Sequence, residues 1–286
     1  MWKYIPWLGP VVALLGVFDL YPLVEVIRLS LTNWSGLGGS RFVGLSNYRS
    51  AVEDPIFREA LLHSAIYAGG TIVAKVVLGL GLALAAAGVT RMVGAYRTFL
   101  LLPAQMSFVA VGVLWSFVYA PSFGLANAAI HQVTGLNTFR LTWLGNPHIA
   151  LYAVMAADVW KWVGIHMIIF YAGLQSIPAQ LYEAAKVDGS SGYSTLRRIT
   201  LPLMRPVILL NVLLAGAGAF NVFDIVYVMT DGGPYNATET VMTYVYRVAF
   251  REFEFGYASA MSVILFCVVL VGTLLVLGLI RRSVRE

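Results

Sequence analysis

Asp158, Trp160, Lys161 and Trp162 form a compact group of chemically active side chains inside an apolar part of this sequence. In a helix, Asp158 and Trp162 are four residues apart and Lys161 follows Asp158 by three, so these side chains share a face. An acid beside flat aromatic rings suits a sugar, which offers hydroxyl groups and an apolar ring face. The alternative is that Asp158 and Lys161 only neutralise each other within the helix.

A second set of polar residues lies in a later apolar segment, at Asn211, Asn221 and Asp224. Asn221 and Asp224 are three residues apart, and Asn211 falls within about 80° of their face at roughly 100° per residue. We expect these residues to line a pathway together with Asp158, although polar side chains also join helices to one another in membranes. Gln105 and Ser107 are further candidates for the lining of that pathway.

Several kinds of chemistry are missing from the sequence. The lysines are Lys3, Lys75, Lys161 and Lys186, and none follows a glycine, which excludes a phosphate-binding G-x-x-x-x-G-K-[ST] loop. The histidines do not have the H-E-x-x-H spacing of a zinc site, and there is no G-x-S-x-G motif. We therefore predict a protein that is not an enzyme, binds no metal or cofactor of its own, and takes its energy from elsewhere.

The composition indicates a membrane protein. Of the 286 residues, 59% are hydrophobic and 12% are charged, whereas soluble domains carry about 25% charged residues. The single cysteine excludes a disulfide framework. The net charge of +5 is explained by basic loops on the cytoplasmic side of a membrane, and the scattered basic residues argue against nucleic-acid binding.

A transmembrane helix needs roughly 20 mostly apolar residues, and six segments meet this requirement. They are residues 5–29, 62–89, 99–119, 149–174, 207–230 and 257–280. The predicted fold class is therefore an all-α membrane protein with six transmembrane helices in a single domain, residues 1–286.

The distribution of basic residues predicts how the chain crosses the membrane. With the N-terminus inside, the basic residues on the cytoplasmic side outnumber those of the outer loops. The cytoplasmic ones are Lys3, Arg91, Arg97, Lys186, Arg197, Arg198, Arg205, Arg281, Arg282 and Arg285. We expect both termini, and the polar segment 176–203, to face the cytoplasm.

The polar segment 176–203 begins with a predicted short helix. Ser176 can cap its first amides, Pro178 suits its first turn, and Gly189 supplies the flexible backbone that ends it. Ala184 and Ala185 lack bulk, so another surface can approach this helix closely. From the residues alone, an amphipathic helix resting on the membrane surface is an equally acceptable reading.

A second short helix is expected to follow, with Ser190 or Ser191 as its cap and Pro202 as its end. Glu183-Ala184-Ala185, Gly189 and the terminal "ITLP" have a spacing that resembles the "EAA – G – I-LP" loop of permeases from ATP-binding-cassette importers. The stretches "FVGLSNY", "VWKWVG", "VMTDGGP" and "GYASAMSV" are similar to the carbohydrate-importer branch, which includes maltose and glycerol-3-phosphate permeases. The resemblance covers nearly the whole chain.

This resemblance implies the type I importer permease fold, a place in the cytoplasmic membrane of a bacterium or archaeon, and a set of partners. Segment 176–203 would form a coupling helix in a groove of a separate ATPase, with Glu183, Ala184, Ala185 and Asp188 at the contact and Gly189 at the turn. Two such ATPases would bind ATP and Mg. A second, unlike permease and an extracytoplasmic sugar-binding protein would complete the complex. The sugar site would lie near the membrane midplane, where position 158 matches a polar sugar-contacting position.

Other interpretations remain open from the sequence. The same machinery could import glycerol-3-phosphate or another polyol phosphate, with Lys161 or Arg28 as the counter-charge, and the sequence does not identify the sugar. An ion-driven carrier and a membrane anchor without transport activity are less favoured. Asp19, Glu25 and Lys75 are charges within predicted spans whose roles are open. We expect them to pair with a neighbouring subunit or to reach toward the membrane surface.

Overall fold

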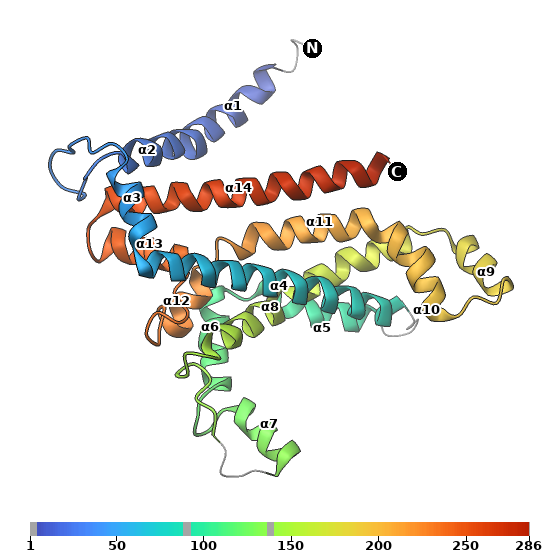
Figure 1. Ribbon diagram of the computed structural model, residues 1–286. Helices are drawn as coiled ribbons and strands as arrows, with labels where there is room; N and C mark the ends of the chain where they lie inside the picture. The colour runs from blue at the N-terminus through green and yellow to red at the C-terminus, as the bar shows by residue number, and fades with distance from the viewer. Residues whose placement is uncertain (1–4, 88–92, 136–139, 286) are drawn as a thin grey trace. The chain divides into compact units, whose positions relative to one another are not determined.

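The computed structural model describes residues 5–87, 93–135 and 140–285 of the chain (Figure 1). In these residues the regular structure is helical apart from one isolated bridge between Thr32 and Phe42. The helices are α1 (Ile5–Leu15), α2 (Tyr21–Ser30), α3 (Ser46–Glu53), α4 (Pro55–Ala87), α5 (Val93–Gln105), α6 (Phe108–Val118), α7 (Leu125–Thr134), α8 (Ala150–Gln175), α9 (Ala179–Val187), α10 (Gly192–Thr195), α11 (Leu201–Ala219), α12 (Asp224–Thr230), α13 (Val241–Phe250) and α14 (Phe255–Arg285). The all-α prediction is confirmed.

The described residues include five helices that are long and apolar enough to cross a membrane. They are Gly9–Ser30, Pro55–Ala87, Ala150–Gln175, Gly192–Ala219 and Phe255–Gly278, and the bent pair α5–α6 makes a sixth if it is counted as one span. The predicted end of the second span at residue 89 lies outside the described residues, as do Lys3 and Arg91.

Contacts within the chain divide it into two compact units, one of residues 1–61 and 240–268 and the other of residues 62–239 and 269–286. The second unit is organised around α8. In the most apolar stretch of this helix, 61% of the residues are buried. Helices α5, α11, α12 and α6 all pack against α8. Because α8 is surrounded by other helices, its polar residues find partners within the chain.

The first unit is held together by hydrogen bonds between loops and helix ends. The side-chain amide of Asn47 donates to the carbonyls of Ser30 and Thr32, at 2.8 Å each. Gly256 lies so close to the Thr32 carbonyl that an added Cβ would stand 2.0 Å from its oxygen. These contacts fix the chain where α2 ends and α14 begins.

Asp54, between α3 and α4, is a second anchor of this unit. Its carboxylate accepts hydrogen bonds from the hydroxyls of Tyr244, at 2.5 Å, and Tyr257, at 2.7 Å. Partial burial raises the pKa of Asp54, but the hydrogen bonds from Tyr244, Tyr257 and backbone amides outweigh it, so the pKa is lowered overall. Asp54 therefore joins α13 and α14 to the start of α4 as a carboxylate.

The predicted third span, 99–119, is bent rather than straight. Helices α5 and α6 meet at 106°, with Pro103 inside the last turn of α5 and Ser107 as the N-cap of α6. The Ser107 hydroxyl accepts a hydrogen bond from the amide of Ala110 at 3.1 Å. Proline and an N-cap in close succession end one helix and begin another, and this signal was present in the sequence.

The predicted fifth span, 207–230, has different boundaries in the structure. It begins at Gly192, because α10, a π-helical turn (Leu196–Thr200) and α11 form one continuous helix, and it ends at Ala219. The expectation that Pro202 ends the preceding helix was wrong. The π turn, in which the Leu201 amide donates to the Leu196 carbonyl, allows proline in the first turn of α11.

Candidate functional site

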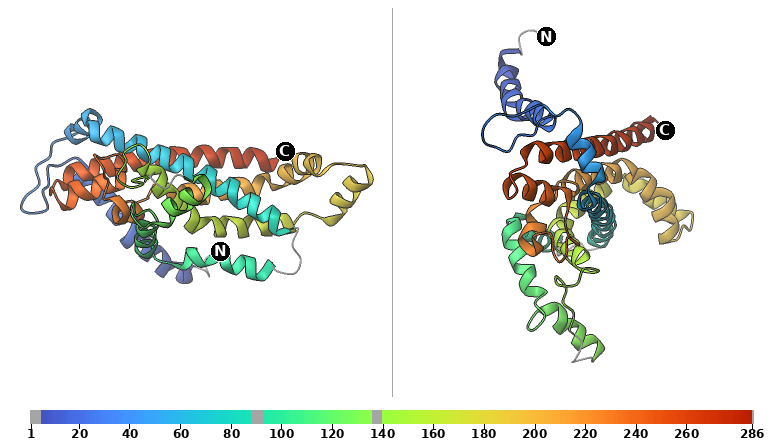
Figure 2. Two further views of the ribbon diagram at one scale, coloured as in Figure 1. Left: turned by 90° about the horizontal axis from the view of Figure 1, so that it is seen from below. Right: turned by 60° about the vertical axis from the view of Figure 1, so that its left-hand side comes forward.

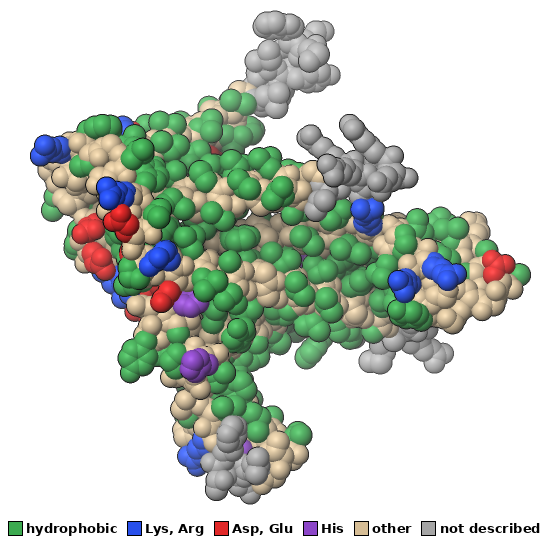
Figure 3. Space-filling model, in the orientation of Figure 1, with side chains coloured by type: hydrophobic (Ala, Val, Ile, Leu, Met, Phe, Trp, Pro, Cys, Tyr) green, Lys and Arg blue, Asp and Glu red, His purple; other side chains and the backbone are tan. Residues whose placement is uncertain are grey.

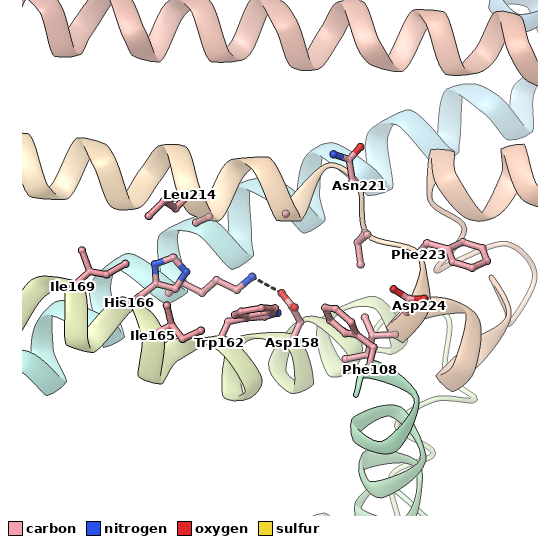
Figure 4. Close-up of a pocket in the computed structure, with 15 residues that line it drawn as sticks. Phe108, Asp158, Trp162, Ile165, His166, Ile169, Leu214, Asn221, Phe223 and Asp224 are labelled. Carbon is pink, nitrogen blue, oxygen red and sulfur yellow. Dashed lines mark ion pairs between the residues drawn. The ribbon is translucent and has the colours of Figure 1, made fainter. Parts of the chain in front are cut away.

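A cavity of about 430 Å³ lies in the second unit, beside α8 and the junction of α11 and α12 (Figure 4). Its wall combines aromatic and aliphatic side chains with a few polar ones, which is the usual make-up of a small-molecule site. The lining residues are Lys75, Phe108, Asp158, Trp162, Ile165, His166, Ile169, Leu214, Ala215, Gly218, Asn221, Val222, Phe223, Asp224 and Ile225.

Asp158 forms an ion pair with Lys75 of α4 across this cavity (Figure 4). The Lys75 Nζ lies 2.6 Å from Oδ2 of Asp158, and both side chains are only about 5% exposed. The expectation that Lys75 pairs with a neighbouring subunit or reaches the membrane surface was therefore wrong. The idea that Asp158 serves only to neutralise Lys161 was also wrong, because the ion partner of Asp158 comes from another helix.

Trp162 lines the cavity together with Asp158, as the spacing of four residues predicts. Its ring lies beside that of Phe108 from α6, with centroids 6.0 Å apart at 50°. Trp160 is not among the lining residues. It packs edge-on against Trp115, at 5.7 Å between centroids, as part of the apolar core.

Lys161 points toward the bend between α5 and α6 rather than into the cavity. Its ammonium donates hydrogen bonds to the carbonyls of Pro103 at 3.4 Å, Ala104 at 3.2 Å and Met106. Backbone groups freed at a break within a membrane need such partners, and the C-terminal end of a helix attracts a cation. Lys161 thus satisfies the broken backbone and supports the position of Phe108.

The approach of α8 to α5 at this level requires a glycine. An added Cβ on Gly164 would stand 1.9 Å from the carbonyl oxygen of Leu100. Any other residue at position 164 would push α5 away from α8. Gly164 therefore fixes the distance over which Lys161 reaches the bend.

His166 and Asn211 form a polar contact that the sequence analysis missed. The His166 Nδ1 lies 2.8 Å from Oδ1 of Asn211, and the amide of Asn211 donates to the Val207 carbonyl at 3.1 Å. A carboxamide oxygen only accepts, so His166 donates here. Asn211 is fully buried between α8 and α11 and is absent from the cavity wall, whereas His166 is part of that wall.

Asn221 and Asp224 line the cavity at the break between α11 and α12. They do not share the face of one helix, because α11 ends at Ala219 and α12 starts at Asp224. The Asn221 amide donates to the Ala217 carbonyl at 3.1 Å and points away from Asp158 (Figure 4). Gln105 and Ser107 are exposed and are not among the lining residues.

The charge of the cavity wall follows from these positions. Asp158 is balanced by Lys75, whereas Asp224 is exposed at the wall, and among the lining residues there is no second lysine or arginine. Two carboxylates against one ammonium leave the wall with an excess of negative charge. An anionic ligand entering this cavity would therefore meet electrostatic repulsion.

The polar segment 176–203 contains α9, which projects beyond the end of α4 (Figures 1 and 2). Charged side chains gather on this end of the second unit, and hydrophobic ones cover the neighbouring helices (Figure 3). Glu183, Ala184 and Asp188 are exposed, whereas Ala185 is buried. The exposed side of α9 is thus free for contact with another molecule, as far as the described residues show.

Gly189 ends α9 in the way the sequence predicts. It has a left-handed φ of +69°, its amide donates to Lys186 at 3.1 Å, and the Ser190 amide donates to Ala185 at 2.9 Å. This pair of bonds is the Schellman motif of helix ends, which favours glycine. A hydrogen bond of 3.2 Å between the Tyr182 and Thr200 hydroxyls connects α9 to the π turn Leu196–Thr200.

The two predicted serine caps of this segment have different outcomes. Ser191 caps α10 by accepting from the Ser194 amide at 3.3 Å. Ser176 does not cap α9, because it is the C-terminal cap of α8 and its hydroxyl donates to the Gly173 carbonyl at 2.7 Å. α8 simply extends farther than the predicted span, and α9 begins directly after Pro178 without a side-chain cap.

Comparison with known proteins identifies the family. Residues 79–285 match the model of the binding-protein-dependent transport system inner membrane component. The chain belongs to this family. It is therefore an inner-membrane component of a binding-protein-dependent transport system.

Individual relatives are similar over most of their lengths. The probable ABC transporter permease protein YurN of Bacillus subtilis is 33% identical, over 99% of this chain and 98% of the relative. The diacetylchitobiose uptake system permease protein NgcF of Streptomyces coelicolor is 35% identical, over 96% of this chain and 80% of the relative.

A solved structure has the same fold. It is a bacterial alginate ABC transporter in complex with an alginate pentasaccharide-bound periplasmic protein. The matching chain has a TM-score of 0.86 and 22% identity, over 98% of this chain and 94% of that one. This likeness confirms the predicted importer-permease fold.

Proposed function

We propose that this chain is the permease subunit of an ATP-driven importer and that its cargo is a neutral sugar or oligosaccharide. The observation that carries the proposal is the cavity beside α8, where the Asp158 carboxylate and the rings of Trp162 and Phe108 face one space. Aromatic rings provide an apolar surface for a sugar ring, and a carboxylate accepts hydrogen bonds from its hydroxyls. The sugar-related activity in the name of NgcF supports the same cargo class.

The net charge of the cavity wall favours a neutral sugar over the alternative cargo, a polyol phosphate. The cavity has an excess of one carboxylate, and Lys161, the expected counter-charge for a phosphate, is engaged with the carbonyls of the α5–α6 bend. Arg28, the other candidate, is paired with Glu25 at 2.8 Å. A phosphate would therefore enter this wall without a free cation, which favours neutral cargo.

Energy would enter through α9. Its exposed side would fit a groove of a separate ATPase that binds ATP and Mg, with Glu183, Ala184 and Asp188 at the contact. Ala185 and Gly189 would hold the helix in position. Closure of two ATPases would move α9, and the Tyr182–Thr200 contact would pass this movement to the long helix that begins at Gly192. The cavity would then open alternately to the two sides of the membrane.

The remaining parts of the proposal concern the assembly. The α9 segment and both termini would face the cytoplasm, and a second, unlike permease would complete the translocation path. An extracytoplasmic binding protein would deliver the sugar to the opposite side. The loop that would lie on that side includes Tyr235, which is 93% exposed, and its residues Asp231, Tyr235 and Asn236 all have left-handed φ angles. Residues with such strained backbone angles cluster at ligand-binding and other functional sites, so this loop suits a docking surface.

The test uses the complete importer in proteoliposomes. Glu183→Lys should abolish ATP hydrolysis stimulated by the loaded binding protein, because it reverses the charge at the ATPase contact, while membrane insertion stays normal. Glu53→Lys, the same reversal at an exposed carboxylate of α3, is the matched control. Normal stimulation by the Glu183→Lys importer would contradict the proposed coupling.

The cargo class is tested with the same preparation. A panel of neutral oligosaccharides and of sugar and polyol phosphates is offered with the binding protein, and ATP hydrolysis is measured. We expect Asp158→Asn to reduce hydrolysis stimulated by a neutral sugar and to leave basal hydrolysis intact. Stimulation by phosphates alone would refute neutral cargo and favour the polyol phosphate.

A further inference from the structure

His166 has a hydrogen bond on one side of its ring and the cavity beside α8 on the other. Its Nδ1 lies 2.8 Å from Oδ1 of Asn211, and its side chain also lines the cavity. Within the part of the chain that the structure describes, the ring makes no second hydrogen bond. The other ring nitrogen, Nε2, is not one of the buried polar atoms that lack a partner, so it keeps contact with open space.

The surroundings of Asn211 determine which nitrogen of His166 carries the proton. The amide NH₂ of Asn211 donates to the Val207 carbonyl at 3.1 Å, one turn earlier in α11, which directs the amide oxygen toward the ring. A carboxamide oxygen has no proton to give, so Nδ1 is the donor of this hydrogen bond. In the neutral imidazole the second nitrogen is then an acceptor. His166 thus offers Nε2 to the cavity as a hydrogen-bond acceptor.

The surroundings of His166 within the cavity are apolar. Figure 4 shows its ring among aliphatic side chains, those of Ile165, Ile169 and Leu214. Asp158 lies eight residues earlier on the same helix, about 12 Å away along the axis. A cargo rich in hydroxyls that fills the cavity would bury some of them against this aliphatic wall, and a buried hydroxyl without a partner is costly. The acceptor at Nε2 removes this cost for a hydroxyl that reaches it.

We propose that His166 is a specificity-determining residue of the cargo site, whose Nε2 accepts a hydrogen bond from one hydroxyl of the sugar. Asn211 is the positioning residue that holds the ring in this tautomer. The inference rests on the proposed function, in which the cavity binds a neutral sugar. Because His166 is about two helical turns from Asp158, the two residues contact different hydroxyls of the cargo.

The imidazole of His166 selects more narrowly than the carboxylate of Asp158. With Nδ1 bound to Asn211, the ring has one acceptor left, and that acceptor takes a single hydrogen bond, whereas a carboxylate has two oxygens and can accept several. The bond to Asn211 also holds the ring in one orientation before the cargo arrives, which lowers the entropic cost of binding. His166 therefore favours a hydroxyl in one position and direction.

The contact is tested by equilibrium binding to the complete importer in nanodiscs, without the binding protein. The probe is the tritiated neutral oligosaccharide that stimulates ATP hydrolysis most, compared with its singly deoxygenated derivatives. In the wild type, the derivative that lacks the matching hydroxyl should bind about tenfold more weakly than the parent sugar. In His166→Phe the parent itself should bind about tenfold more weakly, and that derivative should bind as well as the parent. Equal losses on deoxygenation in both proteins would overturn the proposal.

Further variants separate the acceptor from the shape of the ring. His166→Gln brings a carboxamide oxygen near the position of Nε2 and should retain binding of the parent sugar within about threefold. Asn211→Leu frees the ring to change tautomer, so its affinity should fall between those of the wild type and His166→Phe. His148→Phe, at an exposed histidine outside the cavity wall, is the matched control and should bind like the wild type. Binding by His166→Gln that is as weak as that of His166→Phe would contradict recognition through an acceptor.

A spectroscopic measurement tests the tautomer in the unaltered protein. Nitrogen-15 NMR of the importer in nanodiscs, with the histidines of this chain alone labelled, distinguishes protonated from unprotonated ring nitrogens. The signals of His166, identified by their loss in His166→Gln, should show a protonated Nδ1 and an unprotonated Nε2. Saturation with the same oligosaccharide should shift the Nε2 signal and leave Nδ1 protonated. A protonated Nε2, or a signal that does not move at saturation, would refute the assignment.

These experiments distinguish the inference from the proposed function. The stimulation of ATP hydrolysis by the loaded binding protein, and its loss in Glu183→Lys, report on the importer as a whole. If these results support an importer of neutral sugar and His166→Phe binds the parent sugar normally, only the inference about His166 fails. If no neutral sugar stimulates hydrolysis, the proposed function fails, and the role of His166 fails with it.

Discussion

Helix α8 and the first span, α1 to α2, both carry charges within apolar segments, but they differ in where those charges find partners. In α8, 61% of the residues in the most apolar stretch are buried. Asp158 pairs with Lys75, and Lys161 donates hydrogen bonds to the carbonyls at the α5–α6 bend. In the first span, the corresponding stretch has no buried residue. The packing of helices within the second unit thus gives the charges of α8 their partners, whereas no hydrogen bond or ion pair joins Asp19 to another described residue of its own unit.

The largest expected effect concerns the ion pair of α8. Asp158→Leu leaves the Lys75 ammonium buried and unpaired, which typically costs about 3–5 kcal/mol of stability. We expect this loss in the free energy of unfolding of the chain in detergent micelles, measured by denaturant titration. The double variant Lys75→Met with Asp158→Leu should recover most of it, while transport remains impaired because the cavity has lost its carboxylate.

The control for this comparison is Asp19→Leu in the same unfolding measurement. This substitution should leave the stability of the isolated chain unchanged or raise it, since Asp19 is exposed and no hydrogen bond or ion pair joins it to another described residue of its own unit. If Asp19→Leu costs as much as Asp158→Leu, the contrast between the two spans does not hold.

A smaller effect is expected from Lys161→Met. The change removes a charged donor from the carbonyls of the α5–α6 bend, and hydrogen bonds to charged groups contribute about 1.5–3 kcal/mol. The free energy of unfolding should fall by about this amount, and Lys161→Arg should restore part of it. Lys186→Met, at the exposed end of α9, is the matched control and should have little effect. A loss equal to that of Lys161→Met at this control would contradict a specific role for the bend.

A third prediction uses pH to test a carboxylate of the first unit that does have internal partners. The pKa of Asp54 is lowered in the folded state, since hydrogen bonds from Tyr244 and Tyr257 outweigh the effect of burial. Because the folded-state pKa is lowered, the ionised carboxylate of Asp54 stabilises the fold fully at pH values above its unfolded-state pKa, about 3.9. This stabilisation is lost as the pH falls through the lower, folded-state pKa.

We therefore expect the melting temperature of the wild type to exceed that of Asp54→Asn at pH 6, by an amount corresponding to about 1 kcal/mol. The difference should shrink as the pH falls from about 5 toward 3. Scanning calorimetry in detergent at several pH values makes the comparison. A difference that is independent of pH would show that the hydrogen bonds do not depend on the ionised form of Asp54.

The smallest effect is expected from Glu25→Gln in α2. Glu25 and Arg28 form an exposed pair three residues apart, and such pairs contribute about 0.2–0.5 kcal/mol. The free energy of unfolding should change by no more than this amount. A loss comparable to that of Asp158→Leu would mean that the first span is packed against other helices, contrary to the exposed side chains of α1 and α2.

Much of the local structure was predictable from the sequence. The apolar segments, the end of α9 at Gly189 and the cap at Ser191 all follow from side chains within a few residues of one another. The spacing of Glu183, Ala184, Ala185 and Gly189 also indicated the family. The bend between α5 and α6 was predictable in principle from Pro103 and Ser107, because a helix breaker and a cap stand four residues apart.

Other features depended on which helices pack together. Composition and the 100° periodicity of a helix show that Asp158 and Trp162 share a face, but they do not show that Lys75, in α4, neutralises Asp158. Likewise, the sequence does not reveal that Lys161 binds the α5–α6 bend, that Asn211 bonds to His166, or that a break before Asp224 separates it from α11.

The sequence by itself thus determined that this chain is a polytopic helical permease with a polar segment between two of its spans, since hydrophobicity, helix capping and motif spacing are local properties of the chain. Only the tertiary structure decided which charges are satisfied internally. Burial makes a charge depend on the nearest group in space, and that group belongs to whichever helix packs beside it.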